Sequence, residues 1–247
     1  MPDPHRVTDL TYEEFAAAMR GGRWVLLPFG TIEEHGPHLP LQTDLLYAEH
    51  ICRSVARELG ALAAPGVPYG VCRTMRNFPG TISLTPATLT ALAGEIVAEY
   101  VRHGARRLAL FTGHAEGAQA EALREAALAA VHRDPTLTIL VIGPYDFLGP
   151  VRVEADLVGK DGHAGSIETS TVLAIDATLV HMNRVPAVTR PRLSAYRVLA
   201  HPEQEFPTGV RGDTSRISPA LGVRANAHVV GQIVQLLRNV ERRGTEW

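Results

Sequence analysis

The chain has 247 residues, of which 45% are apolar and 20% are charged, as is ordinary for a soluble globular protein. Its formal net charge is only −2, so it offers no basic surface for a phosphate backbone and we expect no nucleic-acid partner. The first residues lack the basic-then-apolar pattern of a secretion signal, and no run of 18 apolar residues would span a membrane. Two cysteines, Cys52 and Cys72, are too few for a disulfide scaffold. A cytoplasmic protein without membrane contact is therefore expected.

Short apolar runs alternate along the chain with segments of helical pattern. In chain order we predict a strand at 24–29, a helix at 44–59, a strand at 61–67, a loop at 69–85, a helix at 86–103, a strand at 107–112, a helix at 117–133, a strand at 137–142, a loop at 144–165, and helices at 166–176 and 225–240. Such alternation is typical of an α/β fold with a mostly parallel β-sheet flanked by helices on both faces. No linker or repeat interrupts it, so we predict one domain over residues 1–247. The segment 184–224, rich in Pro, Arg and Gly, receives no assignment.

Side chains of the metal-binding types gather where the predicted strands end. Glu33 and His35 follow the first strand, His114 and Glu116 follow the third, and His163 lies in the loop after the fourth. In open parallel sheets, ligands bind beyond the carboxyl ends of the strands. We therefore expect these residues to meet at one edge of the sheet.

Asp44, at the start of the next predicted helix, completes a set of two imidazoles and three carboxylates for metal binding. Imidazole nitrogen and carboxylate oxygen together suit zinc, manganese and similar divalent ions. Two ions that share one carboxylate would use the whole set, and a bound water would become acidic enough to act as a nucleophile. Spacing alone leaves open the alternative that single members are solvated surface residues.

Four segments resemble the motifs of one enzyme family. The stretch from Gly30 to Pro40, GTIEEHGPHLP, followed by Asp44, closely resembles the signature of the creatininase (creatinine amidohydrolase) family. The segments 78–84, 103–116 and 161–170 resemble that family's later blocks, in the same order. The resemblance covers residues from about 10 to 175 and implies a creatininase-like three-layer sandwich.

The resemblance also implies roles for single residues. Glu33, Asp44 and His114 would hold one metal ion. The second ion would be held by His35, Glu116 and the same Asp44, which would bridge the two. His163 and Glu116 would be catalytic, with His163 as the acid or base or as the residue that orients the substrate. Residues expected to support the ligands or touch the substrate are His38, Glu168, Ser83 and Tyr145, whereas Glu34 is expected to point away from the metals.

One departure from the family pattern bears on the second ion. Many members carry Gly-His-Gly-Gly-Asn in the third block and a Glu directly after His-Ala-Gly in the fourth. Here Glu116 follows His114-Ala115, and Ser166 follows His163-Ala164-Gly165. This relocation of one carboxylate, as in creatininase itself, favours Glu116 as a ligand. It also argues against the family branch that trims a peptide.

The substrate pocket is expected to differ from that of creatininase, which has tryptophans in the loop over its active site. The segment 144–165 contains no tryptophan, and the two in the chain are Trp24 and Trp247. Ala115 also stands where creatininase has an aromatic residue. The resemblance thus implies retained metal chemistry with a different pocket.

Together with these residues, the resemblance implies an amidohydrolase with two divalent ions, Zn²⁺ and/or Mn²⁺. It would hydrolyse a C–N bond of a small, cyclic, creatinine-like amide through metal-bound hydroxide. The alternatives within the family are a formamide deformylase, a peptide trimmer, and a hydrolase that opens a ring or lactone. An alternative of another class is a metal-binding protein without turnover. The resemblance also implies a small-molecule substrate and a homo-oligomer, often a hexamer in this family.

Overall fold

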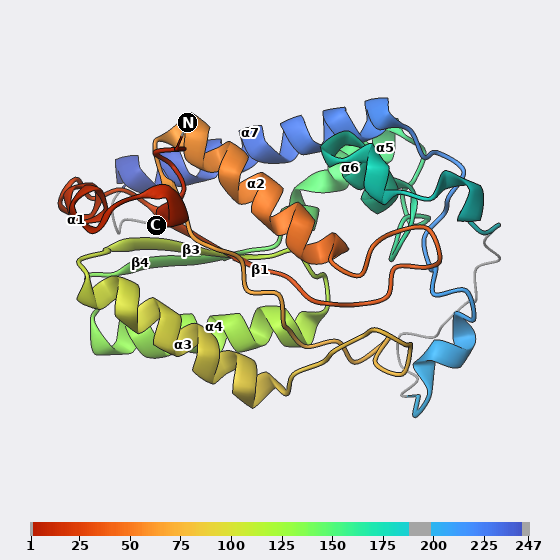
Figure 1. Cartoon of the computed structure of the whole chain (residues 1–247), viewed down its shortest axis with the longest axis horizontal. Coiled ribbons are helices and arrows are strands. Elements are labelled where there is room, and N and C mark those ends of the chain that lie inside the picture. The colour runs from red at the N-terminus through yellow and green to blue at the C-terminus, as the bar shows by residue number, and fades with distance from the viewer. Residues whose placement is uncertain (1, 188–198, 244–247) are drawn as a thin grey trace.

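The computed structural model describes residues 2–187 and 199–243, and its strands form one sheet in the order β2-β1-β3-β4, with every neighbouring pair parallel (Figure 1). The strands are β1 (Val25–Phe29), β2 (Leu62–Ala63), β3 (Arg107–Thr112) and β4 (Thr138–Ile142). The helices are α1 (Tyr12–Arg20), α2 (Thr43–Leu59), α3 (Pro86–Arg102), α4 (Gly117–Arg133), α5 (Gly149–Glu154), α6 (Ser166–Ile175) and α7 (Pro219–Arg243). Short 3₁₀ turns lie at Val7–Asp9, Pro144–Leu148, Ala177–Leu179, Met182–Arg184 and Pro202–Glu205.

The sheet is the middle of three layers, with α2 and α7 on one face and α3 and α4 on the other (Figure 1). Successive side chains of a strand point to opposite faces, so both sets must be apolar in a covered sheet. In β1, Leu26 packs on the α2 side while Val25 and Leu27 pack on the α3 side. The predicted mostly parallel sheet with helices on both faces is confirmed.

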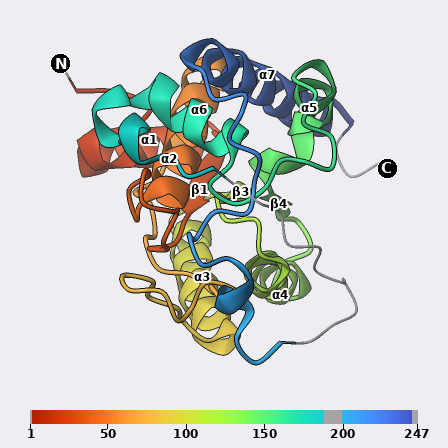
Figure 2. The ribbon, with the colours of Figure 1, turned by 90° about the vertical axis from the view of Figure 1, so that its right-hand side faces the viewer.

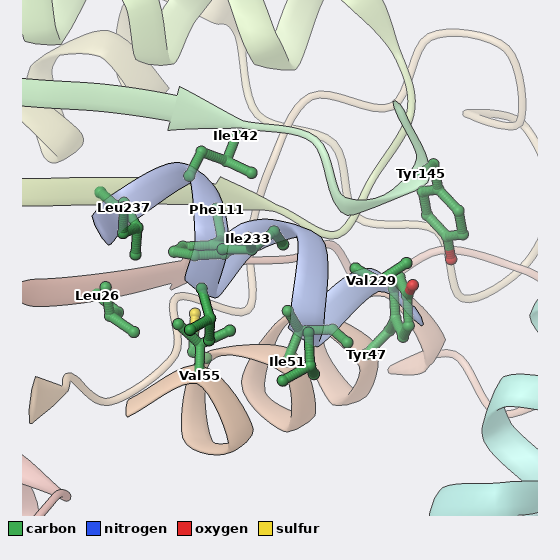
Figure 3. Packing of buried hydrophobic residues seen from close by; sticks show 14 of the residues in the cluster. Leu26, Tyr47, Ile51, Val55, Phe111, Ile142, Tyr145, Val229, Ile233 and Leu237 are labelled. Atoms are coloured by element: carbon green, nitrogen blue, oxygen red, sulfur yellow. The ribbon is translucent and has the colours of Figure 1, made fainter. Parts of the chain in front are cut away.

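The core between the sheet and the pair α2 and α7 is shown in Figure 3. There Phe111 of β3 lies against Ile233 of α7, with Ile51 of α2 beneath. All three side chains are fully buried, and burying one such side chain contributes about 1.5–3 kcal/mol. This packing fixes where α2 begins relative to the ends of β1 and β3.

Two predicted helix boundaries are confirmed, and their capping contacts explain them. The Thr85 hydroxyl oxygen accepts the N–H of Thr88 at 3.1 Å, and Pro86 occupies the first turn of α3. Gly60 ends α2 in the left-handed conformation with φ 74°, which glycine adopts without a steric penalty.

Other predicted boundaries were wrong. Helix α1 was not predicted, although Thr11 and Glu14 form a capping box at its start. The segment 144–165 is not a continuous loop, because it holds a 3₁₀ turn and α5. The strand predicted at 61–67 has only two ladder residues, because the pairing with β1 loses its register after Ala64, and the next N–H that donates to β1 is that of Val67, to the Pro28 carbonyl. The last helix is longer than predicted, running from Pro219 to Arg243.

Part of the unassigned segment 184–224 returns across the carboxyl edge of the sheet; residues 188–198 of it lie outside the described residues. We call residues 206–218 the C-terminal strap. Figure 2 looks onto this edge, with the strap passing in front of the strand ends. The N–H groups of Arg211 and Gly212 donate to the carbonyl of His163, and the N–H of Ser166 donates to that of Asp213. Among the described helices, none combines the length and apolar character needed to cross a membrane.

Candidate metal centre

The centre forms where two adjacent strands and one helix start meet. Strands β1 and β3 are in register at Phe29 and Thr112, so the loops that follow them leave the sheet side by side. The N-terminus of α2 presses against both strand ends. A Cβ at Gly113 would lie 2.0 Å from the backbone oxygen of Asp44, so glycine is required there. This contact brings Asp44 between the residues that follow β1 and β3.

Glu33, Asp44 and His114 form the first cluster of ligand atoms. The Nδ1 atom of His114 lies 2.9 Å from Glu33 Oε2 and 3.0 Å from Asp44 Oδ2. All three side chains are buried. The hydroxyl of Thr31 donates to Asp44 Oδ2, and the Cys72 thiol lies within 4.8 Å of the Glu33 and His114 ligand atoms. The structure thus brings together the three residues expected for one ion, with Cys72 beside them as an unforeseen neighbour.

His35 approaches Asp44 from the other side. Its Nε2 atom lies 3.2 Å from Asp44 Oδ1 and 3.8 Å from Glu168 Oε2. Its Nδ1 atom lies 3.1 Å from the carbonyl oxygen of Glu33. Since a carbonyl only accepts, Nδ1 must carry the hydrogen, so the neutral ring turns the Nε2 lone pair towards the carboxylates. Such an arrangement orients a histidine as a metal ligand.

Glu116 occupies a different position from the one expected beside His35. Its Oε2 atom accepts the N–H of Arg73 at 2.7 Å and that of Thr74 at 3.4 Å. The same oxygen lies 3.8 Å from Nε2 of His114. Within residues 2–187 and 199–243, the carboxylate that approaches His35 besides Asp44 is that of Glu168.

The pKa shifts of the clustered side chains reflect an excess of negative charge at this centre. Burial disfavours protonation of His35, yet Asp44, Glu168 and Glu33 together raise its pKa to about 10. His114 is also buried, and Glu33 and Asp44 raise its pKa well above the ordinary value. Burial raises the pKa of Asp44, but the two imidazoles outweigh that effect and hold it well below its usual range. Without a metal the cluster binds protons, whereas a divalent cation would supply the same charge and leave both imidazoles free to ligate.

Three buried atoms of the cluster support the view that divalent metal ions fit this centre. Glu33 Oε2, His35 Nε2 and His114 Nε2 have no hydrogen-bond partner among the described residues. Buried polar atoms without partners are costly and rare, so each calls for an explanation. Buried, unpartnered nitrogen and oxygen atoms in such a cluster fit divalent metal ions.

His163 lies next to the cluster and is held by Glu34. Its ring centroid lies 4.3 Å from that of His35. Its Nε2 atom lies 2.8 Å from the carbonyl oxygen of Glu34 and 3.2 Å from Glu34 Oε1. Burial and the neighbouring His35 oppose its protonation, but Glu34, Glu33 and Glu168 raise its pKa. Glu34, expected to point away from the metals, thus supports the predicted acid or base.

Three residues expected in supporting roles, His38, Ser83 and Tyr145, make different kinds of contact. The Nε2 atom of His38 lies 2.9 Å from the Thr169 hydroxyl, so His38 braces the loop after β1 against α6. The Ser83 hydroxyl accepts the N–H of Cys72 and donates to a backbone carbonyl, which gives it a role inside the loop 69–85. Tyr145 stacks on Tyr47 with ring centroids 4.9 Å apart.

A cavity of about 370 Å³ opens onto the cluster. Its walls include Glu33, Asp44, His114, Glu116, Glu168, His163 and Tyr145. Ser83 does not line it. Two further wall residues, Arg152 and Arg211, were not foreseen from the sequence, because Arg211 falls in the unassigned segment and Arg152 in a segment predicted as loop. A second cavity of about 220 Å³ shares the wall formed by His114, Ala115 and Tyr145.

Sequence comparison relates the chain to known enzymes. The chain is 36% identical over 213 residues to a creatinine amidohydrolase of Pseudomonas putida, covering 78% of this chain and 81% of that protein. It is 34% identical over 222 residues to a mycofactocin precursor peptide peptidase of Mycolicibacterium smegmatis, covering 83% and 81%.

Structural comparison gives the same relationship. A creatininase described as the Mn form superposes with a TM-score of 0.88 at 31% identity, over 95% of this chain and 98% of that one. A mutant creatininase of Zn–Zn type superposes with a TM-score of 0.87 at 29% identity, over 95% and 97%. The family model for creatininase, creatinine amidohydrolase, matches residues 8–237. The chain therefore belongs to the creatininase family.

Proposed function

We propose that this protein is an amidohydrolase that uses two divalent ions, zinc and/or manganese, to hydrolyse a C–N bond of a small amide. Glu33, Asp44 and His114 would hold one ion. His35 and Asp44 would hold the other together with Glu116. The Mn and Zn–Zn creatininases that resemble this chain support the choice of metals.

The observation that carries the proposal is the approach of His35 Nε2 to Asp44 Oδ1 at 3.2 Å. The hydrogen on Nδ1 leaves both facing atoms with lone pairs when the ring is neutral. Two such atoms repel each other unless a cation or proton lies near both. A bridging carboxylate between two imidazole-lined positions is the arrangement that a pair of metal ions uses.

The ions, when bound, supply Lewis acidity and a water of lowered pKa. The chain's own contribution centres on His163. Because its Nε2 atom must donate to the Glu34 carbonyl, its Nδ1 atom holds the lone pair of the neutral ring. Nothing among the described residues hydrogen-bonds Nδ1, so it can take a proton from the nucleophile and give it to the leaving nitrogen. Glu34 fixes the ring and stabilises the imidazolium that forms between these steps.

The roles of the two carboxylates considered for the second ion, Glu116 and Glu168, are distinguished by experiment. We expect the Glu116→Gln and His35→Ala variants each to lose one equivalent of metal, measured by elemental analysis of dialysed protein. Each variant should also lose its hydrolytic activity. The matched Glu168→Gln variant tests the alternative that this closer carboxylate is the ligand. Full metal content in both Glu116→Gln and His35→Ala would contradict the proposed ligand set.

The substrate class is tested with the metal-loaded enzyme. A panel of cyclic amides, formamides, lactones and short peptides with Mn²⁺ or Zn²⁺ distinguishes the hydrolase alternatives. The cavity volume of about 370 Å³ favours a small cyclic amide. Turnover of peptides alone would instead place the chain beside its peptidase relatives. Tight metal binding with no turnover of any member would favour a metal-binding protein.

A further inference from the structure

Arg211 lies on the cavity wall, and among the residues that the structure describes it has no partner of opposite charge. It belongs to the C-terminal strap, and its side chain is exposed while its neighbours Val210 and Gly212 are buried. Its guanidinium carbon lies 5.6 Å from the ring centroid of the buried Phe206. The side chain is therefore held by stacking, which leaves its N–H donors available.

The other cation on this wall, Arg152, is already neutralised. Its Nε atom lies 3.1 Å from Asp161 Oδ2, and one terminal nitrogen donates to the Tyr145 carbonyl at 3.2 Å. Arg211 forms no such contact with any residue of 2–187 or 199–243. Arg152 thus has a structural role, whereas Arg211 lines the cavity with a guanidinium that no described residue pairs.

Arg211 is also fixed relative to the candidate acid or base. Its backbone N–H donates to the carbonyl oxygen of His163 at 2.9 Å, and the N–H of Gly212 donates to the same atom at 3.0 Å. Val210 packs against the loop after β1, because a Cβ at Gly36 would lie 2.4 Å from its Cγ2 atom. The strap therefore carries Arg211 at a set position beside the reacting centre.

We propose that Arg211 binds a carboxylate of the substrate, so that the natural substrate is a small amide that carries a carboxylate group. This proposal rests on the proposed hydrolase function and names its substrate class. A guanidinium pairs with a carboxylate through two parallel hydrogen bonds. Because Arg211 is the one unpaired guanidinium among the described residues of the wall, the cavity matches a single negative charge better than a phosphate dianion, which several donors usually surround.

The test compares acids with their neutral amides. The probes are 5-oxoproline with 5-oxoprolinamide, hydantoin-5-acetic acid with its amide, and N-acetylglycine with N-acetylglycinamide, with binding measured by calorimetry on metal-loaded protein. We expect at least one acid to bind about 10- to 100-fold more tightly than its amide, the usual range for a charge-assisted pair. Arg211→Met should abolish this preference, and Arg211→Lys should keep part of it.

Arg216→Met is the matched control, because Arg216 lies on the same strap but outside this cavity, near Asp156. It should keep the preference for the acid. Metal content of each variant shows whether the centre is intact. Equal binding of acid and amide in all three pairs, or a preference that survives in Arg211→Met, would overturn the proposal. Failure of the hydrolase function is seen separately, as absence of bound metal or of turnover in the unaltered protein.

Discussion

Gly113 permits the contact that positions Asp44, and its replacement by alanine tests how the centre is built. The residue follows β3 directly, and the added Cβ would lie 2.0 Å from the Asp44 backbone oxygen and 3.0 Å from the Ala48 side chain. Contacts below 3.0 Å are not tolerated, so the start of α2 would have to move by about 1 Å away from the strand end. Both candidate metal positions use Asp44, so both would be disturbed.

The change in the free energy of unfolding of Gly113→Ala follows from two opposing contributions. Overpacking of this kind costs about 1–3 kcal/mol. Replacing glycine also restricts the unfolded chain, which stabilises the folded protein by about 0.4–1 kcal/mol. We expect metal-free Gly113→Ala to unfold about 3–6 °C lower, since 1 kcal/mol corresponds to about 2–4 °C in a protein of this size. A shift of about 1 Å also exceeds the tolerance of about 0.2 Å in ligand distances, so metal binding should be lost.

The assay measures the melting temperature of chelator-treated protein and the metal content of reloaded protein. Gly94→Ala is the matched control, because Gly94 lies inside α3 and an added Cβ would meet nothing within 4 Å. That variant should gain about 0.5–1 kcal/mol from helix propensity and keep its metals. The reasoning is refuted if Gly113→Ala keeps both the unaltered melting temperature and the full metal content.

Three further variants address catalysis, pocket shape and loop anchoring. His163→Ala should keep its metals but lower kcat by about 100-fold or more, as loss of a general acid or base does, which steady-state kinetics with parallel metal analysis would check. Ala115→Tyr should fill the boundary between the two cavities. We expect kcat/KM to fall at least tenfold for the bulkiest amides that the enzyme hydrolyses. An equal loss for the smallest amide would contradict this expectation. Gln119→Leu should lower the melting temperature by about 5–10 °C, because Gln119 donates to the Gly30 carbonyl and accepts the N–H of Val71. An unchanged melting temperature would mean that these buried partners find other hydrogen bonds.

The layered fold could be predicted because its signals are local. The apolar runs at 24–29, 107–112 and 137–142 are bounded by glycine, proline and capping residues, and the structure places strands within each. Alternation with helices then leaves few arrangements other than a parallel sheet. Local signals failed where a segment is stabilised by its neighbours, as in α5, or where a strand loses register with its partner, as after Ala64. The single domain, the homo-oligomer and the cytoplasmic location stay predictions.

The candidate ligands could be predicted because their side-chain chemistry and their position after strands are both written in the chain. Glu33, Asp44 and His114 meet as expected, since adjacent parallel strands end at the same edge. The sequence could not decide which carboxylate approaches His35. Glu168 comes close because α6 packs against α2, while Glu116 is drawn away by the N–H groups of Arg73 and Thr74.

The sequence by itself determined the α/β class, the family and the inventory of candidate ligands, because these depend on residue type and short-range spacing. Tertiary structure alone decided what surrounds that inventory. The strap lies about 50 residues beyond His163 in the chain, yet two of its N–H groups bind the His163 carbonyl. No local pattern marks such a contact, because it depends on how the layers and loops pack together. Arg211 lines the cavity for that reason, and so the feature that would select the substrate appears only in the folded chain.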